Sequence, residues 1–316
     1  LLYGLTGELI FSEISKILLV NNLSTSPAAL LSVMLILAGI GFKISVVPFH
    51  SWAPDTYEGS PLPVTAYLSV SSKATGFVAL MIILTKVFPD SGSSWGIVLV
   101  FISGLTMFIG NLSALQQSNP VRLLAYSSIA QAGFILAPLA VAGISGDYAD
   151  GIYASVTYLI IYAFMNLGAF LVVNVLINTS GSNDIYEWGG LAKHQPLTAI
   201  FTTVFFFSLA GIPPLGGWFA KFVVFRSLLS TGEVYGITLA IIGAINAVIG
   251  LVFYARISKI IWMDSPSENI TINTKPVLLS PLKVVGFISL VITFLAGIFP
   301  NIFSNLGNAS ALFFNS

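Results

Sequence analysis

The hydrophobic positions of this chain gather into eight long runs, and the short segments between them carry most of the charged residues. A helix needs about 20 residues to cross a bilayer core of about 30 Å, and every run reaches that length. The runs fall near residues 28–52, 61–85, 95–117, 120–143, 151–177, 196–229, 235–262 and 278–300. The pattern therefore predicts an all-α polytopic membrane protein, with about eight transmembrane helices in a single membrane domain over residues 1–316.

The composition supports the membrane class. The 316 residues are 56% hydrophobic and 8% charged, whereas soluble proteins carry about 25% charged residues. Lipids are therefore expected neighbours, and a formal net charge of zero gives no indication of a nucleic-acid partner. The chain contains no Cys, which excludes disulfides and thiolate metal sites. His50 and His194 lie far apart in the sequence and make a weak case for a metal site.

The polar segments also predict an orientation. Residues 8–20 mix Glu and Lys with Leu and Ile, as a short amphipathic helix at the membrane interface does. Basic residues are more numerous at the end of the runs that holds the 53–60 loop, which we call side X: Arg122, Lys193, Arg256, Lys259, Lys275 and Lys283. The opposite end, side Y, holds Lys86, Arg226 and Lys16. Because basic loops stay inside, we expect the 53–60 loop to face the cytoplasm of a bacterial inner membrane, or the matching side of an organellar one.

Two of the runs contain helix breakers. Pro48 cannot donate a hydrogen bond to the carbonyl of Ile44, so it breaks the first run. The stretch around Gly211, Pro213 and Pro214 interrupts the sixth run, which is longer than a single span requires. Paired interrupted helices point to an inverted-repeat transporter. The chain also opens on Leu1 within an apolar stretch, and we interpret it as the C-terminal part of a longer subunit.

Three lysines, Lys43, Lys73 and Lys221, lie inside these apolar runs, which contain no Asp or Glu near them. A charge at the bilayer centre costs about 2.5–3.5 kcal/mol or more, so such residues are rare and usually functional. Lys43 and Lys73 lie roughly 15–18 Å deep by helical rise, near the midplane. The amines can accept and release protons, which predicts a path for protons across the membrane. The alternative is snorkelling of the long side chains to the interface.

Several neutral side chains could extend this path. Tyr158, Tyr162 and Asn166 recur every four residues and share one helix face, where they could order water between the lysines. The alternative for each is an ordinary interhelical hydrogen bond. His50 follows the Pro48 break and could relay protons, since its ordinary pKa lies near 6.5, or it could cap broken backbone at the mouth on side X.

Specific motifs then suggest a family. The run GFKISVVPFHSWAPDTYEGSP at residues 41–61 resembles the signature of subunit N of respiratory complex I, the NADH–quinone oxidoreductase. RLLAYSSI at 122–129 and SLAGIPP at 208–214, followed by Lys221, are similar to further motifs of that subunit. The resemblance covers nearly the whole chain. The YEGSP run at 57–61 favours subunit N over its paralogues and over multi-subunit Na⁺/H⁺ antiporters.

The resemblance implies an antiporter-like bundle of fourteen helices, in which the two breaks belong to helices seven and twelve. Lys43, Lys73 and Lys221 then match proton-carrying lysines of helices seven, eight and twelve. The family pairs the first of them with a Glu on helix five, which lies outside this chain. NADH, FMN, iron–sulfur clusters and quinone would bind to partner subunits, both membrane and peripheral, with no cofactor or metal in this chain.

Three functions remain open. The first is a proton-translocating subunit of a redox-driven oxidoreductase, a translocase without a redox centre of its own. The second is a subunit of a Mrp-type Na⁺/H⁺ antiporter, which would show Na⁺ dependence. The third is a structural membrane subunit that conducts nothing, in which replacing Lys73 would be silent.

Overall fold

The structure is a computed structural model that describes the backbone of residues 1–265 and 280–315 and the side chains of 1–265 and 284–314. Every regular element in the described part is a helix. In chain order the main helices are α1 (Leu2–Thr6), α2 (Phe11–Val20), α3 (Pro27–Ile44), α4 (Trp52–Gly59), α5 (Leu62–Tyr67), η1 (Leu68–Ser72), α6 (Lys73–Lys86), η2 (Pro89–Ser91), α7 (Gly92–Leu115), α8 (Pro120–Ser145), α9 (Tyr148–Ser180), η3 (Ile185–Trp188), α10 (Leu191–His194), α11 (Pro196–Ala210), α12 (Gly216–Ser230), α13 (Val234–Met263), α14 (Ser280–Ile298) and α15 (Asn301–Asn315).

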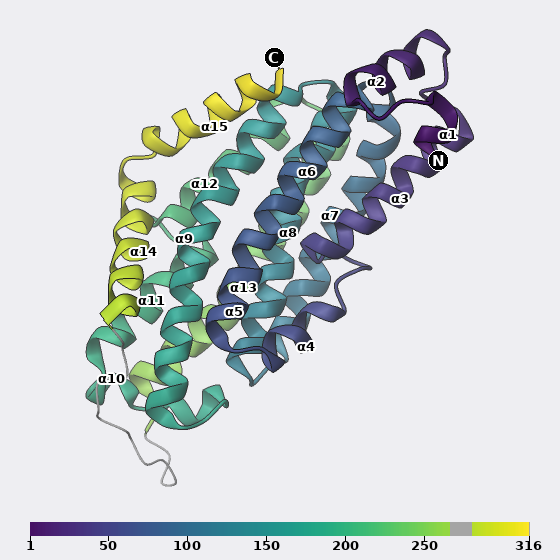
Figure 1. Ribbon diagram of the computed structural model, residues 1–316. Coiled ribbons are helices and arrows are strands. Elements are labelled where there is room, and N and C mark those ends of the chain that lie inside the picture. The colour runs from purple at the N-terminus through teal and green to yellow at the C-terminus, as the bar shows by residue number, and fades with distance from the viewer. Residues whose placement is uncertain (266–279, 316) are drawn as a thin grey trace.

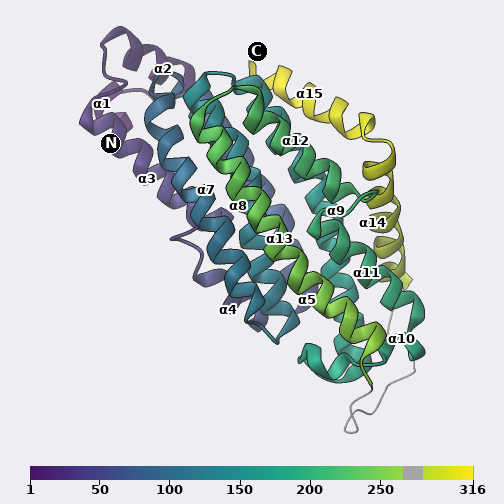
Figure 2. The ribbon, with the colours of Figure 1, turned by 180° about the vertical axis from the view of Figure 1, so that it is seen from behind.

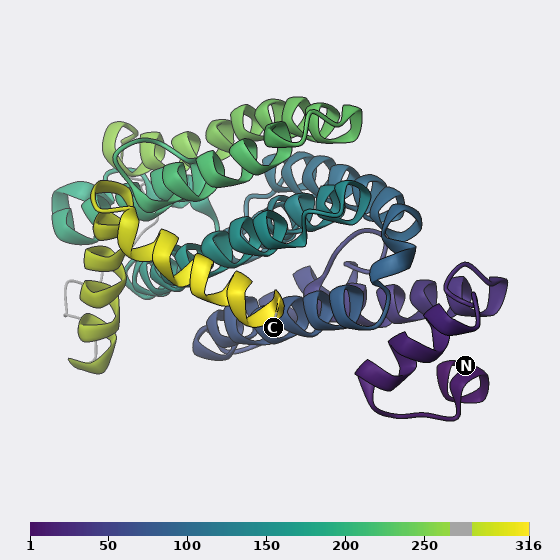
Figure 3. The same ribbon diagram turned by 90° about the horizontal axis from the view of Figure 1, so that it is seen from above.

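The long helices run alongside one another as a bundle (Figures 1 and 2). Among the described residues, six helices are long and apolar enough to cross a membrane, or seven if the bent pair α14–α15 counts as one span. α4 and α10 lie at one end, which is side X. α1, α2 and α15 lie at the other end, side Y, together with the C-terminus (Figure 1). Seen from above, α14 and α15 occupy one edge and α1–α2 the opposite edge (Figure 3).

The centre of the bundle is α8. Asn119 accepts hydrogen bonds from the N–H groups of Val121 and Arg122, and Pro120 occupies the first turn, so the helix start is well defined. Almost every residue that follows is buried, which agrees with a helix that is apolar on all sides. Close packing against α7 requires small residues, because a Cβ on Gly133 would lie 2.7 Å from Met107 Cγ.

The first predicted run differs from the structure. The run was placed at residues 28–52 with its break at Pro48, but α3 already ends at Ile44. Ser45 adopts a left-handed conformation with φ of 59°, and the Val46 N–H bonds to the Gly41 carbonyl, as at a standard helix C-terminus. The break therefore begins before the proline, and the chain resumes a helix only at α4.

Two other departures concern the runs at 61–85 and 278–300, whereas the expected break in the run at 196–229 is confirmed. The run at 61–85 contains a π-helical turn, η1, directly before Lys73, which the hydrophobic pattern did not indicate. The run at 196–229 is two helices, α11 and α12, on either side of the expected break. The last run, 278–300, begins outside the described residues. Lys275 and the side chain of Lys283 also lie outside the described part of the chain. This last run corresponds to α14, which bends by 87° into the unforeseen helix α15.

Candidate functional site

Lys73 is enclosed at the centre of the bundle. It is the first residue of α6 after the π-helical turn η1, and its side chain is only 1% exposed. Its Nζ donates hydrogen bonds to Ser128 on α8, at 2.7 Å to the carbonyl oxygen and 2.6 Å to Oγ. A buried ammonium needs such partners, because an isolated charge in an apolar interior is very costly. Snorkelling to the interface does not occur for this residue.

Ser128 connects Lys73 to α9. The Tyr162 hydroxyl lies 2.8 Å from Ser128 Oγ and also donates to the Ser69 carbonyl at 3.3 Å. Asn166 Nδ2 donates to Ser69 Oγ at 2.8 Å. A π-helical turn shifts backbone carbonyls out of the regular α-helical ladder, and Ser69 lies in that turn. The predicted side chains Tyr162 and Asn166 thus both contact Ser69, which lies four residues before Lys73.

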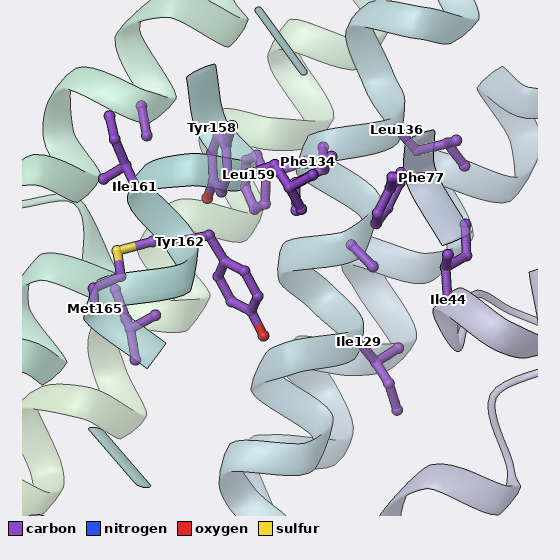
Figure 4. Packing of buried hydrophobic residues seen from close by; sticks show 14 of the residues in the cluster. Ile44, Phe77, Ile129, Phe134, Leu136, Tyr158, Leu159, Ile161, Tyr162 and Met165 are labelled. Carbon is purple, nitrogen blue, oxygen red and sulfur yellow. The ribbon is translucent and has the colours of Figure 1, made fainter. Parts of the chain in front are cut away.

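Gln131, one turn after Ser128 on α8, continues the polar series. The Tyr158 hydroxyl donates to its Oε1, while its Nε2 donates to the Leu209 carbonyl at 3.1 Å and to the Tyr254 hydroxyl at 3.3 Å. Tyr254 in turn lies 2.5 Å from Ser127 Oγ. All of these groups are buried. Figure 4 shows Tyr158 and Tyr162 projecting from α9 among apolar side chains, with Phe134 beside Tyr158.

Lys221 lies at the other end of this series. It is 6% exposed, and its Nζ donates to the Ala210 carbonyl at 2.7 Å and lies 5.0 Å from the centre of the Phe134 ring. Ala210 is the last residue of α11, so the ammonium sits at the negative end of that helix. Lys221 and Gln131 therefore bind adjacent carbonyls, those of Ala210 and Leu209.

The second break produces this placement. Gly211 ends α11 with φ of 96°, a conformation that favours glycine. The chain then continues into α12, whose Gly217 N–H bonds to Ser208 Oγ at 3.1 Å. Gly217 lies so close to α11 that a Cβ would collide with the Ser208 carbonyl oxygen. The break thereby brings a lysine of α12 to the end of α11.

Lys43 is placed differently. It lies in the last turn of α3 with its side chain exposed, and its stem runs beside Gly76 on α6. Within the described part of the chain, no hydrogen bond or ion pair holds its ammonium. The structure therefore does not join Lys43 to the polar series of Lys73.

His50 lies between α3 and α4 and is half-buried. Its Nδ1 is buried without a hydrogen-bond partner among the described residues. Burial lowers the pKa of its imidazole, because desolvation disfavours the charged form. It occupies the end of the break on side X, and the structure does not connect it to Lys73.

Sequence reasoning missed part of the polar series, namely Ser127, Ser128, Phe134 and Tyr254. Ser127 and Ser128 lie inside the 122–129 motif, but nothing in the spacing marked Ser128 as the partner of Lys73, 55 positions earlier, or Ser127 as the partner of Tyr254. For Tyr254 the one available signal in the sequence was its hydroxyl, a polar group within a long apolar run.

A second polar cluster lies at side X. Arg122 Nη1 contacts Asp55 Oδ1 and Glu58 Oε2, each at 2.7 Å, and Asn119 Nδ2 donates to Glu58 Oε1 at 2.8 Å. These contacts attach α4 to the start of α8. They hold the segment after the first break in place from its solvent side.

A helical bundle with two broken spans and two lysines buried in its core defines the class of antiporter-like membrane subunits. The family model described as NADH:quinone oxidoreductase/Mrp antiporter, TM, matches residues 1–250. The chain belongs to this family.

Relatives agree with this assignment. The chain is 39% identical to NADH-quinone oxidoreductase subunit N of Moorella thermoacetica, over 99% of this chain and 63% of that protein. It is 38% identical to NAD(P)H-quinone oxidoreductase subunit 2 of Trichormus variabilis, over 98% of this chain and 60% of that protein. The resemblance to subunit N is thus confirmed. The chain spans about three-fifths of the length of these relatives.

Solved structures confirm the fold class. A chain of respiratory complex I from Thermus thermophilus with bound aureothin superposes with a TM-score of 0.74 at 26% identity, covering 96% of this chain and 62% of that chain. The Mrp complex from Dietzia sp. gives a TM-score of 0.83 at 24% identity, covering 98% of this chain and 63% of that one. The second likeness concerns the fold alone.

Proposed function

We propose that this chain belongs to the proton-translocating, antiporter-like subunit of a redox-driven NADH–quinone oxidoreductase, in which Lys43, Lys73 and Lys221 carry the proton. The names of the relatives support the oxidoreductase. Electron transfer through NADH, FMN, iron–sulfur clusters and quinone is assigned to partner subunits, membrane and peripheral. The chain itself contributes a translocase step without a redox centre.

The observation that carries the proposal is the polar series between two enclosed lysines. Lys73 is bonded to Ser128, Gln131 follows one turn later on the same helix, and Gln131 and Lys221 bind adjacent carbonyls of α11. Figure 4 shows the packed apolar side chains around Tyr158 and Tyr162, which belong to this series. A purely structural subunit has no need for two buried amines, since buried charges cost stability unless they are compensated.

The direction of transport follows from the charge bias. With side X facing the cytoplasm of a bacterial inner membrane, protons enter near the 53–60 loop and His50 and reach Lys73. They then pass by way of Tyr162, Tyr158 and Gln131 to Lys221, and leave on side Y. The break around Pro213 and Pro214 frees backbone carbonyls on this route, which favours hydration there.

A Mrp-type Na⁺/H⁺ antiporter remains the second candidate, because the Mrp complex shares the fold. The two functions differ in their ion dependence. An oxidoreductase subunit moves protons in proportion to electron flow without Na⁺, whereas an antiporter subunit requires a Na⁺ gradient.

The decisive experiment replaces Lys73 in the assembled complex. Lys73→Met keeps most of the length of the side chain and removes the ammonium group with its exchangeable protons. We expect fewer protons pumped per electron pair, while assembly and subunit content stay normal. Unchanged pumping in a normally assembled complex would favour the structural alternative, and Na⁺-dependent exchange without electron flow would favour the antiporter.

A further inference from the structure

The part of the bundle beyond Lys221 contains a cavity on side Y. It has a volume of about 400 Å³ and lies between the start of α9, the end of α12 and the helix α15. Its lining includes Asp147, Asp150, Tyr153, Arg226 and Asn308. The Tyr153 hydroxyl lies 2.9 Å from Ser304 Oγ, which attaches α15 as the outer wall.

Asp150 is the unusual residue of this cavity. Its Oδ1 accepts a hydrogen bond from Arg226 Nη2 at 3.0 Å, and the guanidinium lies 5.4 Å from the centre of the Tyr153 ring. Its Oδ2 is buried and has no hydrogen-bond partner among the described residues. The side chain of Asp150 is 18% exposed, against 55% for Arg226. An unpaired, buried carboxylate oxygen is costly and calls for an explanation.

Asp150 also lines a second space, which adjoins the cavity. This gap of about 160 Å³ has no room for a water molecule, and Pro138, Gly151 and Ser227 share its lining. Pro138 lies one turn after Phe134 on α8, and Phe134 is the ring beside Lys221. Ser227 lies six residues after Lys221 on α12, about 9 Å of helical rise. The gap therefore lies beside the cavity on side Y of Lys221, and Asp147 and Asp150 belong to the walls of both spaces.

We infer that Asp150 is the proton-accepting carboxylate at the side-Y end of the path, and that its ion pair with Arg226 closes this end while Asp150 is ionised. The inference rests on the function proposed above. When water connects Lys221 to the cavity, an N–H bond of the Lys221 ammonium breaks and an O–H bond forms on Asp150 by way of that water, leaving a neutral amine and a carboxylic acid. The acid loses its attraction for Arg226, and its proton passes to water in the cavity.

Closure by the ion pair would meet a requirement of pumping. If Lys221 were connected to side Y at all times, protons would return through it down the gradient. An ionised Asp150 paired with Arg226 holds α9 to α12 at this level. Proton arrival removes the charge on which the pair depends, so the exit opens when there is a proton to release.

The test compares matched variants in the assembled complex. Asp150→Asn keeps the shape of the side chain and an oxygen for Arg226, but it cannot carry the proton. Asp147→Asn is the control, because Asp147 is exposed on the same cavity and its Oδ1 caps the Asp150 N–H, which an Asn oxygen can also do. We expect Asp150→Asn to lose as many pumped protons per electron pair as Lys73→Met, with Asp147→Asn unchanged and Asp150→Glu restored.

The role of the ion pair has its own readout. In vesicles that carry an imposed proton gradient and no electron donor, Arg226→Gln should increase the passive proton leak through the complex, because the closing pair is lost while Asp150 can still carry a proton. Asp150→Asn also removes the charge of the pair, but it leaves no group that carries the proton, so it should not increase the leak. A leak equal to wild type would overturn the closing role of Arg226.

The outcomes separate the two proposals. If Lys73→Met lowers pumping while Asp150→Asn resembles Asp147→Asn, the role of Asp150 is wrong and the proposed function stands. If Asp150→Asn assembles poorly, the carboxylate-bearing Asp150→Glu decides, because pumping that stays low in an assembled Asp150→Glu complex would also overturn the inference. If neither Lys73→Met nor Asp150→Asn changes pumping, the proposed function fails first.

Discussion

In both broken spans the first half-helix ends in a left-handed residue, but the side chains around the two breaks differ. At the first break α3 ends in a left-handed Ser45, and at the second α11 ends in a left-handed Gly211. In both, a lysine lies at the C-terminal end of the half-helix before the break: Lys43 within α3 itself, and Lys221 reaching back from α12. The negative end of a helix favours a cation in either arrangement.

The difference lies in what covers each lysine. Lys221 is enclosed between α11 and α8, with a carbonyl and an aromatic ring as partners, whereas Lys43 is exposed, with only its stem beside Gly76 of α6. A broken helix therefore places a lysine at the end of a half-helix, and the neighbouring helices determine whether this lysine belongs to a buried polar series. At the second break, Lys221 has a hydrogen-bond acceptor and an aromatic ring as partners within the described chain. At the first break, the ammonium of Lys43 has no partner among the described residues.

The largest expected contrast concerns the glycines that allow each break to pack. In Gly217→Ala the new Cβ would collide with the backbone oxygen of Ser208, which cannot move aside. In Gly41→Ala the nearest atom is Phe49 Cδ2 at 2.9 Å, on a side chain that can shift. We expect overpacking of more than about 3 kcal/mol and poor assembly for Gly217→Ala, and near-normal assembly for Gly41→Ala. Native gels of membranes with equal expression measure this, and equal losses would contradict it.

The second prediction compares the lysines directly. Lys221→Ala should lower proton pumping per electron pair while membrane insertion stays intact, because the change removes a charge from the membrane rather than a packing group. Protease protection of the loops checks insertion, and quinone reduction checks the electron path. Normal pumping in an assembled Lys221→Ala complex would exclude Lys221 from the path.

A further prediction concerns the partner of Lys43 at the first break. Since the described chain leaves its ammonium without a partner, we expect a carboxylate from another segment of the complete subunit within about 4–6 Å of Nζ, most simply the helix-five Glu of the family. If this acid moves away, the proton of Lys43 is held less tightly and can be passed toward Lys73. A structure of the complete subunit with no carboxylate near Lys43 would remove this switch.

The third prediction concerns the left-handed residues. Gly211→Ala places a side chain at φ of 96° and a Cβ 2.8 Å from Lys221 Cδ, so we expect a loss of about 1–3 kcal/mol and reduced pumping. Ser45→Gly relieves a left-handed conformation worth about 1–2 kcal/mol, against an entropy cost of about 0.4–1 kcal/mol. It should leave the thermal inactivation midpoint unchanged or slightly raised. A midpoint lowered as far as in Gly211→Ala would show that the Ser45 hydroxyl is needed.

The smallest expected effects lie in the side-X cluster that attaches α4. Glu58 bonds to both Arg122 and Asn119 and its side chain is 40% exposed, whereas Asp55 bonds to Arg122 alone and is 76% exposed. Exposed ion pairs contribute about 0.2–1 kcal/mol, so Glu58→Gln should lower the inactivation midpoint slightly and Asp55→Asn less. Both effects should shrink in high salt. A larger effect of Asp55→Asn would mean that Asp55 has another partner in the complex.

Much of this protein could be predicted from its sequence. Long apolar runs with few charges can satisfy their backbone in a membrane only as helices, so the class of the fold followed from composition and period alone. Lys73 and Lys221 could be singled out because a charge in such a run is costly and rare. The breaks could be located to within a few residues because Gly and Pro act on the local backbone.

The tertiary structure decided which of these residues meet. No local rule places Ser128 against Lys73 or Ala210 against Lys221, because these contacts depend on how α6, α8, α11 and α12 pack against one another. The same holds for Asp150, an unremarkable loop acid in the sequence that becomes a half-paired carboxylate between two spaces once α9, α12 and α15 are assembled. Local sequence determines where a helix begins, breaks and carries a charge. Long-range packing determines whether that charge is buried, paired or exposed, because burial depends on neighbours distant in the chain.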